Sequence, residues 1–300
     1  MPRVSIGLPV HNGENYLGLA ADSLLAQTFV DFELVIVDNA STDGTAEICR
    51  SLLRRDLRVR YHRNDTNIGS GPNLARAFDL SSDSEYFQWA AHDDVHEPRF
   101  LEACVDALDR DPSAILAFPR VQFIGPDGAP CGERERAVAL GSPDAATRYR
   151  ALLPSYDCLE IFGVIRRTAL RRRPVIGFHP DGDGVLLAAL ALEGRFHEVP
   201  EVLFHSRRHP GQATVRLARS PRAWAVDWNP RMANRMVFPA WRRIWELWRG
   251  YLRATMPLHD RIRCGRALAQ WTRWRIPKLV EDVSFYLKKP AGVASDGQPR

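Results

Sequence analysis

Short apolar runs alternate with stretches of helical spacing over the first hundred residues. The runs, each short enough for a buried strand, lie at residues 4–10, 32–37, 58–62 and 86–91. Between them, apolar residues recur every three or four positions at residues 16–27, 46–53 and 73–80. Because neighbouring parallel strands need crossover connections, this order predicts an α/β fold with a doubly wound, mostly parallel sheet and flanking helices.

The pattern is less regular beyond residue 100. We expect an amphipathic helix, a pair of strands ending in a hairpin turn, an apolar helix and a second pair of strands, at residues 100–108, 115–118 with 121–124, 185–192, and 196–199 with 202–205. Pro200 separates the last two strands, since proline cannot donate to a sheet ladder. The arginines at 166–167 and 171–173 are interpreted as a solvated helix face, with contact to an anionic ligand as the alternative.

Polar residues gather directly after three of the predicted strands. Asn12 follows the first strand, the stretch Asp38–Thr45 follows the second, and Asp93 and Asp94 follow the fourth. The carboxyl ends of parallel strands meet at one edge of an open sheet, where such folds bind ligands. The sequence therefore predicts a nucleotide-sized crevice at that edge.

Two adjacent carboxylates after a buried strand are costly unless a cation meets them. Asp93 and Asp94 end the segment EYFQWAAHDDVHEP, whose first half is aromatic and apolar. Mg²⁺ and Mn²⁺ prefer oxygen ligands and often share them with substrate phosphates. A divalent metal site is one interpretation; the other is that the pair only caps the helix beginning near Pro98.

Several nucleotide-binding classes are disfavoured by missing motifs. Neither GxGxxG nor GxxxxGK[ST] follows any predicted strand, which argues against nicotinamide dehydrogenases and P-loop enzymes. The loop after the first strand, HNGENY, carries no basic residue, which disfavours a nucleotidyltransferase. Five scattered cysteines without a CxxC pair argue against a disulfide framework and a zinc site.

Charge divides the chain into two parts. Residues 1–215 hold 23 arginines against 30 aspartates and glutamates, whereas residues 216–290 hold 17 lysines and arginines against 5 acidic residues and seven of the eight tryptophans. We predict a catalytic domain at 1–215, a basic, Trp-rich helical extension at 216–290 and a disordered tail at 291–300.

The extension contains the helix WRRIWELWRGY, in which Trp241, Ile244, Trp245 and Trp248 would share one face. Such a helix packs on its own domain, on a second subunit in a homodimer, or on a membrane surface, and packing is the preferred interpretation. No nucleic-acid-binding module accompanies the charge, so nucleic acid is not expected as a partner. The longest apolar run, Val185–Leu192, is too short to span a bilayer, and residues 1–10 do not resemble a signal peptide, so we expect a cytoplasmic protein, with membrane contact at most peripheral.

The motifs in this order resemble those of family 2 glycosyltransferases, which have the GT-A fold. The resemblance rests on Pro9-x-x-Asn12, on DNASTDGT at residues 38–45, on Asn67-Ile68-Gly69 and on Trp89-x-x-His92-Asp93-Asp94, and it covers residues 3–215. It implies an inverting, metal-dependent transferase for a nucleotide sugar, most often UDP- or dTDP-linked. The acceptor would be a glycan or lipid-linked hydroxyl in cell-envelope polysaccharide or glycolipid synthesis.

The resemblance also implies donor-binding roles. Asp38 would accept from the ring N–H of the base, Asp43 would lie near base and ribose, and Pro9 and Asn12 would form the floor of the nucleoside pocket. For Asp38 and Asp43, turn and N-cap chemistry is the alternative.

Asp93 and Asp94 resemble the DXD element of the family. Asp94 would bind the Mg²⁺ or Mn²⁺ ion and Asp93 the ribose. The sequence departs from the common pattern here, because Ala91 stands where an aspartate is usual and the role of His92 is open.

The closing part of the resemblance places a catalytic base and a phosphate loop. Asp183 would deprotonate the acceptor hydroxyl, with Asp181 as competing candidate and helix capping as the plain alternative; the glutamate that usually precedes this base is replaced by Gly182. In Ser206–Gln212, Arg208 and His209 would meet phosphate charge or the metal. The departures keep a non-catalytic nucleotide-sugar-binding or scaffold protein as the rival hypothesis.

Overall fold

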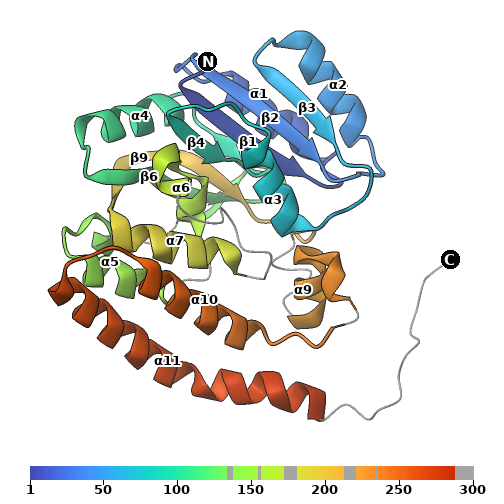
Figure 1. The fold of residues 1–300 in the computed structure, drawn as a ribbon. Helices are drawn as coiled ribbons and strands as arrows, with labels where there is room; N and C mark the ends of the chain where they lie inside the picture. The colour runs from blue at the N-terminus through green and yellow to red at the C-terminus, as the bar shows by residue number, and fades with distance from the viewer. Residues whose placement is uncertain (134–137, 155–156, 172–180, 213–220, 234, 288–300) are drawn as a thin grey trace.

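The computed structural model describes residues 1–133, 138–154, 157–171, 181–212, 221–233 and 235–287 (Figure 1). Its centre is a nine-stranded sheet with strand order β3-β2-β1-β4-β8-β6-β9-β5, in which β7 pairs with β6 off this path. The strands are β1 (Val4–Val10), β2 (Phe32–Asp38), β3 (Val59–Arg63), β4 (Tyr86–Trp89), β5 (Val95–His96), β6 (Ala114–Ile124), β7 (Pro130–Glu133), β8 (Val164–Arg166) and β9 (Arg195–Arg207).

Helices connect and cover these strands. They are α1 (Leu17–Leu25), α2 (Thr45–Arg55), α3 (Ser70–Asp79), α4 (Phe100–Arg110), α5 (Ala145–Leu152), α6 (Arg167–Leu170), α7 (Gly182–Glu193), α9 (Pro221–Trp228), α10 (Pro239–Arg253) and α11 (Leu258–Leu287). Short 3-10 turns lie at η1 (Val138–Gly141), η2 (Leu159–Phe162) and η3 (Pro230–Met232).

The N-terminal half of the sheet confirms the predicted doubly wound arrangement. β1 pairs in parallel with β2 and β4, and β3 pairs in parallel with β2. β8 runs antiparallel between β4 and β6, and β9 then pairs in parallel with β6. The sheet is therefore mostly parallel, and its carboxyl edge gathers the loops that follow β1, β2 and β4.

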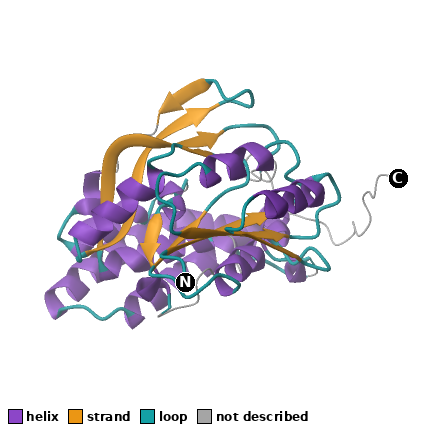
Figure 2. Ribbon diagram, turned by 90° about the horizontal axis from the view of Figure 1, so that it is seen from above, coloured by secondary structure: helices purple, strands orange, loops and turns teal. Residues whose placement is uncertain are grey.

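Side-chain alternation along the strands supplies both faces of the sheet with a core. Val4, Ile6 and Leu8 of β1 pack in one cluster with side chains of α1, α2 and α4. Phe87 and Trp89 of β4 belong to the cluster on the opposite face, which includes Phe78 of α3 and extends to α5 and α7. Successive side chains of a strand point to opposite faces, so these short apolar strands need helices on both sides. Figure 2 shows the twisted sheet with helices along both faces.

The two predicted strand pairs after residue 110 are wrong in their extent. β6 is one strand through Pro119, and β9 is one strand through Pro200. Their register shifts where the prolines lie, since Pro119 pairs with Val199 and the next residue, Arg120, pairs with Val202. A bulge of this kind absorbs residues that cannot join the ladder, so the prolines bend the strands without ending them.

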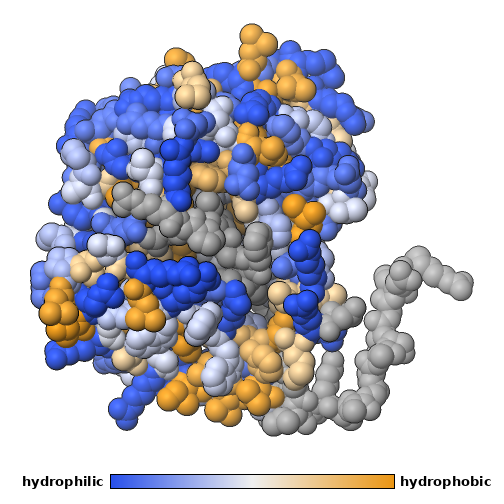
Figure 3. Space-filling view, in the orientation of Figure 1, coloured by the Kyte–Doolittle hydropathy of each residue, from blue (hydrophilic) through white to orange (hydrophobic). Residues whose placement is uncertain are grey.

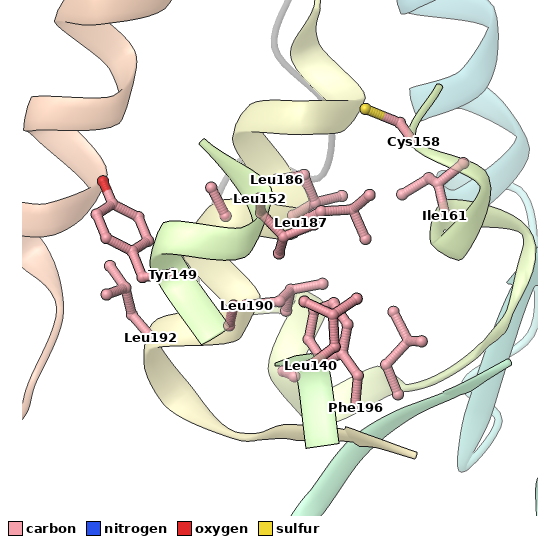
Figure 4. Close-up of a cluster of buried hydrophobic side chains, with 14 of the residues drawn as sticks. Leu140, Tyr149, Leu152, Cys158, Ile161, Leu186, Leu187, Leu190, Leu192 and Phe196 are labelled. Carbon is pink, nitrogen blue, oxygen red and sulfur yellow. The ribbon is translucent and has the colours of Figure 1, made fainter. Parts of the chain in front are cut away.

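The apolar helix predicted at 185–192 is the centre of the second core. Leu186, Leu187 and Leu190 of α7 are at most 4% exposed. They pack between α5, the turns η1 and η2, and the start of β9, as Figure 4 shows. A helix that is apolar on nearly all sides must be enclosed. Here α10 packs on the side of α7 that faces away from the sheet.

The C-terminal helices pack on the sheet domain instead of standing apart. α10 contacts α7, α11 contacts α5 and α10, and α9 contacts α3 (Figure 1). The buried face of α10 carries Arg243 and Leu247. Of the predicted face, Ile244 and Trp248 pack against the core, whereas Trp241 and Trp245 are 50% and 63% exposed, so the prediction is only partly confirmed. The Arg243 guanidinium donates through Nη2 to the Leu153 carbonyl and lies 3.9 Å from the Asp181 carboxylate, and these two partners allow a basic residue to occupy the packed face.

Other sequence-based expectations can be placed as well. The arginines at 166 and 167 are not a solvated face: Arg166 donates to the Ala114 and Leu108 carbonyls, and Arg167 is buried over the Phe78 ring. The boundary after residue 215, the tail 291–300 and the arginines 172–173 lie outside the described residues. Among the helices that are described, none combines the length and the apolar character needed to cross a bilayer.

Candidate active site

The loops after β1 and β2 are bound to each other at the carboxyl edge. The Asn12 side chain accepts a hydrogen bond from Thr42 N–H at 2.9 Å, and Asn12 N–H donates to the Ser41 hydroxyl at 2.9 Å. Asn12 and Ala40 both have positive φ, 53° and 58°, a conformation that costs energy for residues with a Cβ. Asn12 therefore shapes this edge, next to Pro9 of β1, which is partly exposed.

Asp43 holds the turn into α2. One carboxylate oxygen accepts from the N–H and hydroxyl of Thr45, and the other accepts from Glu14 N–H. Burial opposes ionisation of this carboxyl, but these hydrogen bonds outweigh it and lower the pKa of Asp43. Asp43 therefore makes the turn contacts that were the alternative to a nucleotide-binding role, although the N-cap residue of α2 is Gly44, and Asp43 is ionised at neutral pH.

Asp38, the last residue of β2, is completely buried. Its carboxylate accepts from Ser41 N–H at 2.8 Å, the Tyr61 hydroxyl at 2.9 Å and the Arg63 guanidinium at 2.7 Å. Sequence reasoning missed Arg63, which pairs with Asp38 in the β2–β3 register. The signal available was its place, one residue past the predicted third strand and so at the same sheet edge.

Four asparagines connect the end of β2 to the loop before α3. Asn39 donates to the Asn67 side chain and accepts from Asn64 and from Ile68 N–H, and Asn64 also donates to Asn73. Such a network of amides fixes the loop 64–69 against the crevice. It gives the Asn67-Ile68-Gly69 motif a structural reason.

The carboxylate pair after β4 is held by the end of β9. Asp94 is 3% exposed, and one of its oxygens accepts from Arg207 N–H at 2.7 Å. Burial raises the pKa of Asp94 well above its usual range, and the adjacent charge of Asp93 raises it further. Asp93 lies 3.0 Å from Nε2 of His209, so the structure places His209 beside the carboxylate pair, and the metal-binding roles of Asp94 and His209 stay a prediction.

Arg207 organises this corner, and sequence reasoning overlooked it in favour of its neighbour. Its Nε donates to the Asp93 carbonyl, and its Nη1 donates to the Gly125 and Pro126 carbonyls in the β6–β7 turn. Its guanidinium also lies 4.7 Å from the Tyr16 ring centre. The Arg208 guanidinium instead lies 4.2 Å from the Phe123 ring, so its donor-binding role stays a prediction.

His92 packs against the loop after β1. A Cβ on Gly13 would lie 2.9 Å from the His92 ring and 2.5 Å from Val10, so only glycine leaves room for the imidazole there. Burial lowers the pKa of His92, which keeps the ring neutral at physiological pH. Its place beside the carboxylate pair is clear, and its chemical role stays open.

The carboxylate pair suits a hard divalent cation that takes its other ligands from elsewhere. Within the described ranges, no three His, Cys, Asp or Glu side chains are grouped as a complete metal-binding set. Two adjacent carboxylates, one with its pKa raised by burial and then by the charge of its neighbour, would nevertheless be stabilised by a cation. Mg²⁺ typically uses one or two carboxylates and completes its shell with water and substrate phosphates.

Asp183 lies in the first turn of α7, at the start of the second core. It accepts from Gly184 N–H at 2.8 Å, and burial raises its pKa to about 6, helped by the charge of Asp181. Asp181 has a positive φ of 64° and lies 3.9 Å from the Arg243 guanidinium. Burial therefore favours the protonated form of Asp183, whereas Asp181 faces the Arg243 cation. The residues Gly177–Pro180 that precede them lie outside the described ranges.

Comparison with known families agrees with this arrangement. The sequence model described as "Glycosyl transferase family 2" matches residues 5–177. Because the match covers more than half of the chain, this protein belongs to family 2 of the glycosyltransferases. The resemblance predicted from the motifs is thereby confirmed. The match ends before Asp183 and the C-terminal helices.

Two relatives illustrate how far the similarity extends. An uncharacterized glycosyltransferase of Rickettsia felis is 37% identical over 110 residues, which are 36% of this chain and 18% of that protein. Chondroitin synthase of Pasteurella multocida is 32% identical over 130 residues, 43% of this chain and 13% of that protein. The chain thus spans less than a fifth of the length of either relative.

Solved structures confirm the GT-A fold over nearly the whole chain. S. aureus TarS 1-349 in complex with UDP-GlcNAc gives a TM-score of 0.65 at 19% identity, covering 96% of this chain and 76% of that one. The mannosyltransferase PcManGT from Pyrobaculum calidifontis, in complex with GDP-Man and Mn²⁺, gives 0.52 at 17% identity, covering 96% and 87%. At these identities the likeness concerns the fold.

Proposed function

We propose that this chain transfers a sugar from a UDP- or dTDP-linked donor to a hydroxyl of a glycan or lipid-linked acceptor, with inversion at the anomeric carbon, in polysaccharide or glycolipid synthesis. The observation that carries the proposal is the meeting of the DNASTDGT loop and the Asp93–Asp94 pair at one sheet edge, in a chain of this family. Relatives that include chondroitin and hyaluronan synthases support polysaccharide synthesis as the setting.

The donor is proposed to bind along this edge. Asp38 and Asp43, with Pro9 and Asn12, provide the nucleoside pocket. Asp38 acts there in one of two ways: it positions Tyr61 and Arg63 through their hydrogen bonds, or it gives up one of these bonds to accept from the base N–H. Asp93 meets the ribose, and Arg208 meets phosphate charge. The rigid hydrogen-bonding of the loops supports this role, because a preorganised pocket loses little entropy on binding.

A divalent ion, Mg²⁺ or Mn²⁺, is proposed to bind at Asp94 with His209 beside it. When bound, the ion would neutralise the diphosphate as it leaves. The buried, mutually repelling carboxylates support the assignment. Asp93 and His209, now paired at 3.0 Å, hold each other in place at the same corner.

Asp183 is proposed as the general base. Its carboxylate takes the proton of the acceptor hydroxyl while the acceptor oxygen bonds to the anomeric carbon and the bond from that carbon to the diphosphate oxygen breaks. A base with a pKa of about 6 is ionised at neutral pH and still accepts a proton readily. Attack from the face opposite the diphosphate produces the inversion.

Thermal unfolding with a panel of UDP-, dTDP- and GDP-sugars, with and without Mn²⁺, tests the donor site. A ligand at 100 times its Kd should raise the unfolding free energy by about 2.7 kcal/mol. We expect a Mn²⁺-dependent shift with one nucleotide family that disappears in Asp94→Asn and persists in Asp65→Asn, a matched change at an exposed loop carboxylate.

Release of free sugar from the same nucleotide sugars tests for an enzyme. Metal-dependent turnover that Asp183→Asn removes, with donor binding kept, would support catalysis. Binding without turnover on any acceptor would support the non-catalytic rival, and no shift with any sugar nucleotide would overturn the proposal.

A further inference from the structure

The outer side of α11 carries a continuous row of exposed residues that do not pack in the protein core. Its members recur every three or four residues and are all exposed: Leu258, Ile262, Arg266, Ala269, Arg273, Ile276, Val280 and Val283. We call these eight residues the α11 stripe. The opposite side of the same helix is buried on α5 and α10 through Cys264, Leu268 and Trp271. The stripe is thus a second amphipathic face on a helix already anchored by its first.

The stripe exposes more apolar surface than packing requires. Leu258, Ile276 and Val280 are 72%, 52% and 62% exposed. Figure 3 shows hydrophobic side chains gathered along the lower edge of the molecule, over α11. Scattered exposed apolar residues need no explanation, but a periodic row along seven turns of one helix indicates an interaction surface.

The charges within the stripe decide between partners. Arg266 and Arg273 form no ion pair with any described carboxylate, although Arg263 pairs with Asp144 and Lys278 with Glu281 close by. None of the eight stripe residues is acidic. A second copy facing this stripe would bring its own two arginines toward these two and bury them without a counter-charge, which is costly.

An anionic lipid surface supplies what a second copy lacks. Phosphate groups would meet Arg266 and Arg273 while the apolar members enter the boundary between headgroups and acyl chains. Trp241 and Trp245 of α10 and Trp274 of α11 are at least half exposed, and tryptophan prefers the boundary between headgroups and acyl chains. Residues 221–287 hold 13 lysines and arginines against 5 acidic residues, so the whole extension favours the approach to negative charge.

We propose that the α11 stripe docks this protein on an anionic membrane surface, with the helix lying in the plane of the headgroups. The inference is independent of the donor chemistry proposed above. It assigns to the C-terminal extension two functions on opposite sides: the buried side completes the core around α7, and the exposed side binds lipid.

Vesicle flotation of the full chain tests the proposal. We expect binding to phosphatidylcholine vesicles that contain phosphatidylglycerol, no binding to phosphatidylcholine alone, and release at high salt. The double variant Arg266→Gln/Arg273→Gln should weaken binding about fivefold for each arginine, the factor equivalent to about 1 kcal/mol. Ile276→Ser/Val280→Ser should weaken it as well.

Val30→Ser/Leu57→Ser is the matched control, since both residues are exposed and apolar but lie on the far part of the sheet domain. It should bind like the wild type. All variants should keep the wild-type melting temperature and sugar-nucleotide response, which separates this test from that of the donor site. Absent vesicle binding at low salt, equal binding to neutral vesicles, or binding indifferent to the stripe would each overturn the proposal. A stripe-dependent dimer in light scattering would overturn it in favour of a second copy.

Discussion

Asp38 belongs to the proposed donor-binding site, and Asp183 is the proposed catalytic base. They differ in the hydrogen bonds that they accept. Asp38 is fully buried and accepts three hydrogen bonds, two of them from Tyr61 and Arg63 on the neighbouring strand. Among the described residues, Asp183 accepts from Gly184 N–H, and burial raises its pKa to about 6. The hydrogen bonds to Asp38 favour its ionised form, whereas burial favours the protonated form of Asp183. A general base needs a pKa closer to neutrality than the ordinary value for aspartate.

The largest effect should come from Asp183, the carboxylate with the raised pKa. Asp183→Asn removes the proton acceptor but keeps the shape, so we expect the sugar-transfer rate to fall about 10²- to 10⁴-fold, while the Kd for the donor nucleotide changes little. Steady-state transfer and donor titration measure the two quantities. Asp181→Asn is the control and should keep most of the activity. If Asp181→Asn is the inactive variant, the base has been misassigned.

The same carboxylate should make stability depend on pH. Its folded pKa of about 6 lies above the ordinary value of 3.8, so the folded state binds this proton more tightly than the unfolded state. The wild-type unfolding free energy should therefore fall as pH rises from about 4 to 6, by at most about 3 kcal/mol. Asp183→Asn lacks this loss and should be more stable than the wild type at pH 7.5, and equal to it near pH 4. Urea unfolding at both pH values measures this, and an Asp183→Asn protein less stable at pH 7.5 would contradict the contrast with Asp38.

Replacing Asp38 by asparagine should destabilise the protein, whereas the same change at Asp183 should stabilise it at pH 7.5. Asp38→Asn presents an amide to the Tyr61 and Arg63 donors and leaves one of them unpaired, so the unfolding free energy should fall by about 2 kcal/mol. Urea unfolding is the measurement, with Asp65→Asn at an exposed position as the unchanged control. A stable Asp38→Asn protein that has lost only donor binding would mean that Asp38 contacts the donor without supporting the fold.

A smaller effect should report on the contact between α9 and α3. A Cβ on Gly71 would lie 2.3 Å from the Trp228 indole nitrogen, whereas a Cβ on Gly18 would meet nothing within 4 Å. Gly71→Ala should destabilise by about 1–2 kcal/mol through overpacking. Gly18→Ala, in helix α1, should stabilise by about 0.5–1 kcal/mol. Thermal unfolding compares the pair; equal changes in both variants would show that α9 is not packed on α3.

The sheet has a parallel half, β1 to β4, and a second half built on β6 and β9. The sequence was a good guide to the first half and a poor guide to the second. In the parallel half, each strand is short and bounded by turn residues. The hydrophobic pattern and these turn residues therefore predicted β1 to β4 and the loops at their ends. The motif at 38–45 and the pair Asp93–Asp94 needed only that topology to be brought together. Local signals were sufficient to place these loops, because β1, β2 and β4 are neighbours in the sheet, but they did not reveal that Arg207 of β9 holds the Asp93–Asp94 pair.

In the other half, the deciding contacts are distant in sequence. Strands were predicted to end before Pro119 and Pro200, but the register shift between β6 and β9 lies at both prolines and lets each strand continue. The buried side of α10 follows Arg243, whose partner is the Leu153 carbonyl. Periodicity favoured the tryptophans, since no local pattern reveals that a buried arginine has an acceptor ninety residues away. Arg207 was passed over for the same reason, because its three acceptors lie in other loops.

Arg207 also joins two parts of the molecule that loop engineering usually treats as separate. Its backbone N–H holds Asp94, its Nε holds the Asp93 carbonyl, and its Nη1 holds the carbonyls of Gly125 and Pro126 in the β6–β7 turn. A chimera that replaces this turn with a loop from another transferase would leave the guanidinium without two of its acceptors and free the carboxylate corner to shift. Grafts at this turn should therefore be designed around two backbone carbonyls, and the side chains between them can be varied.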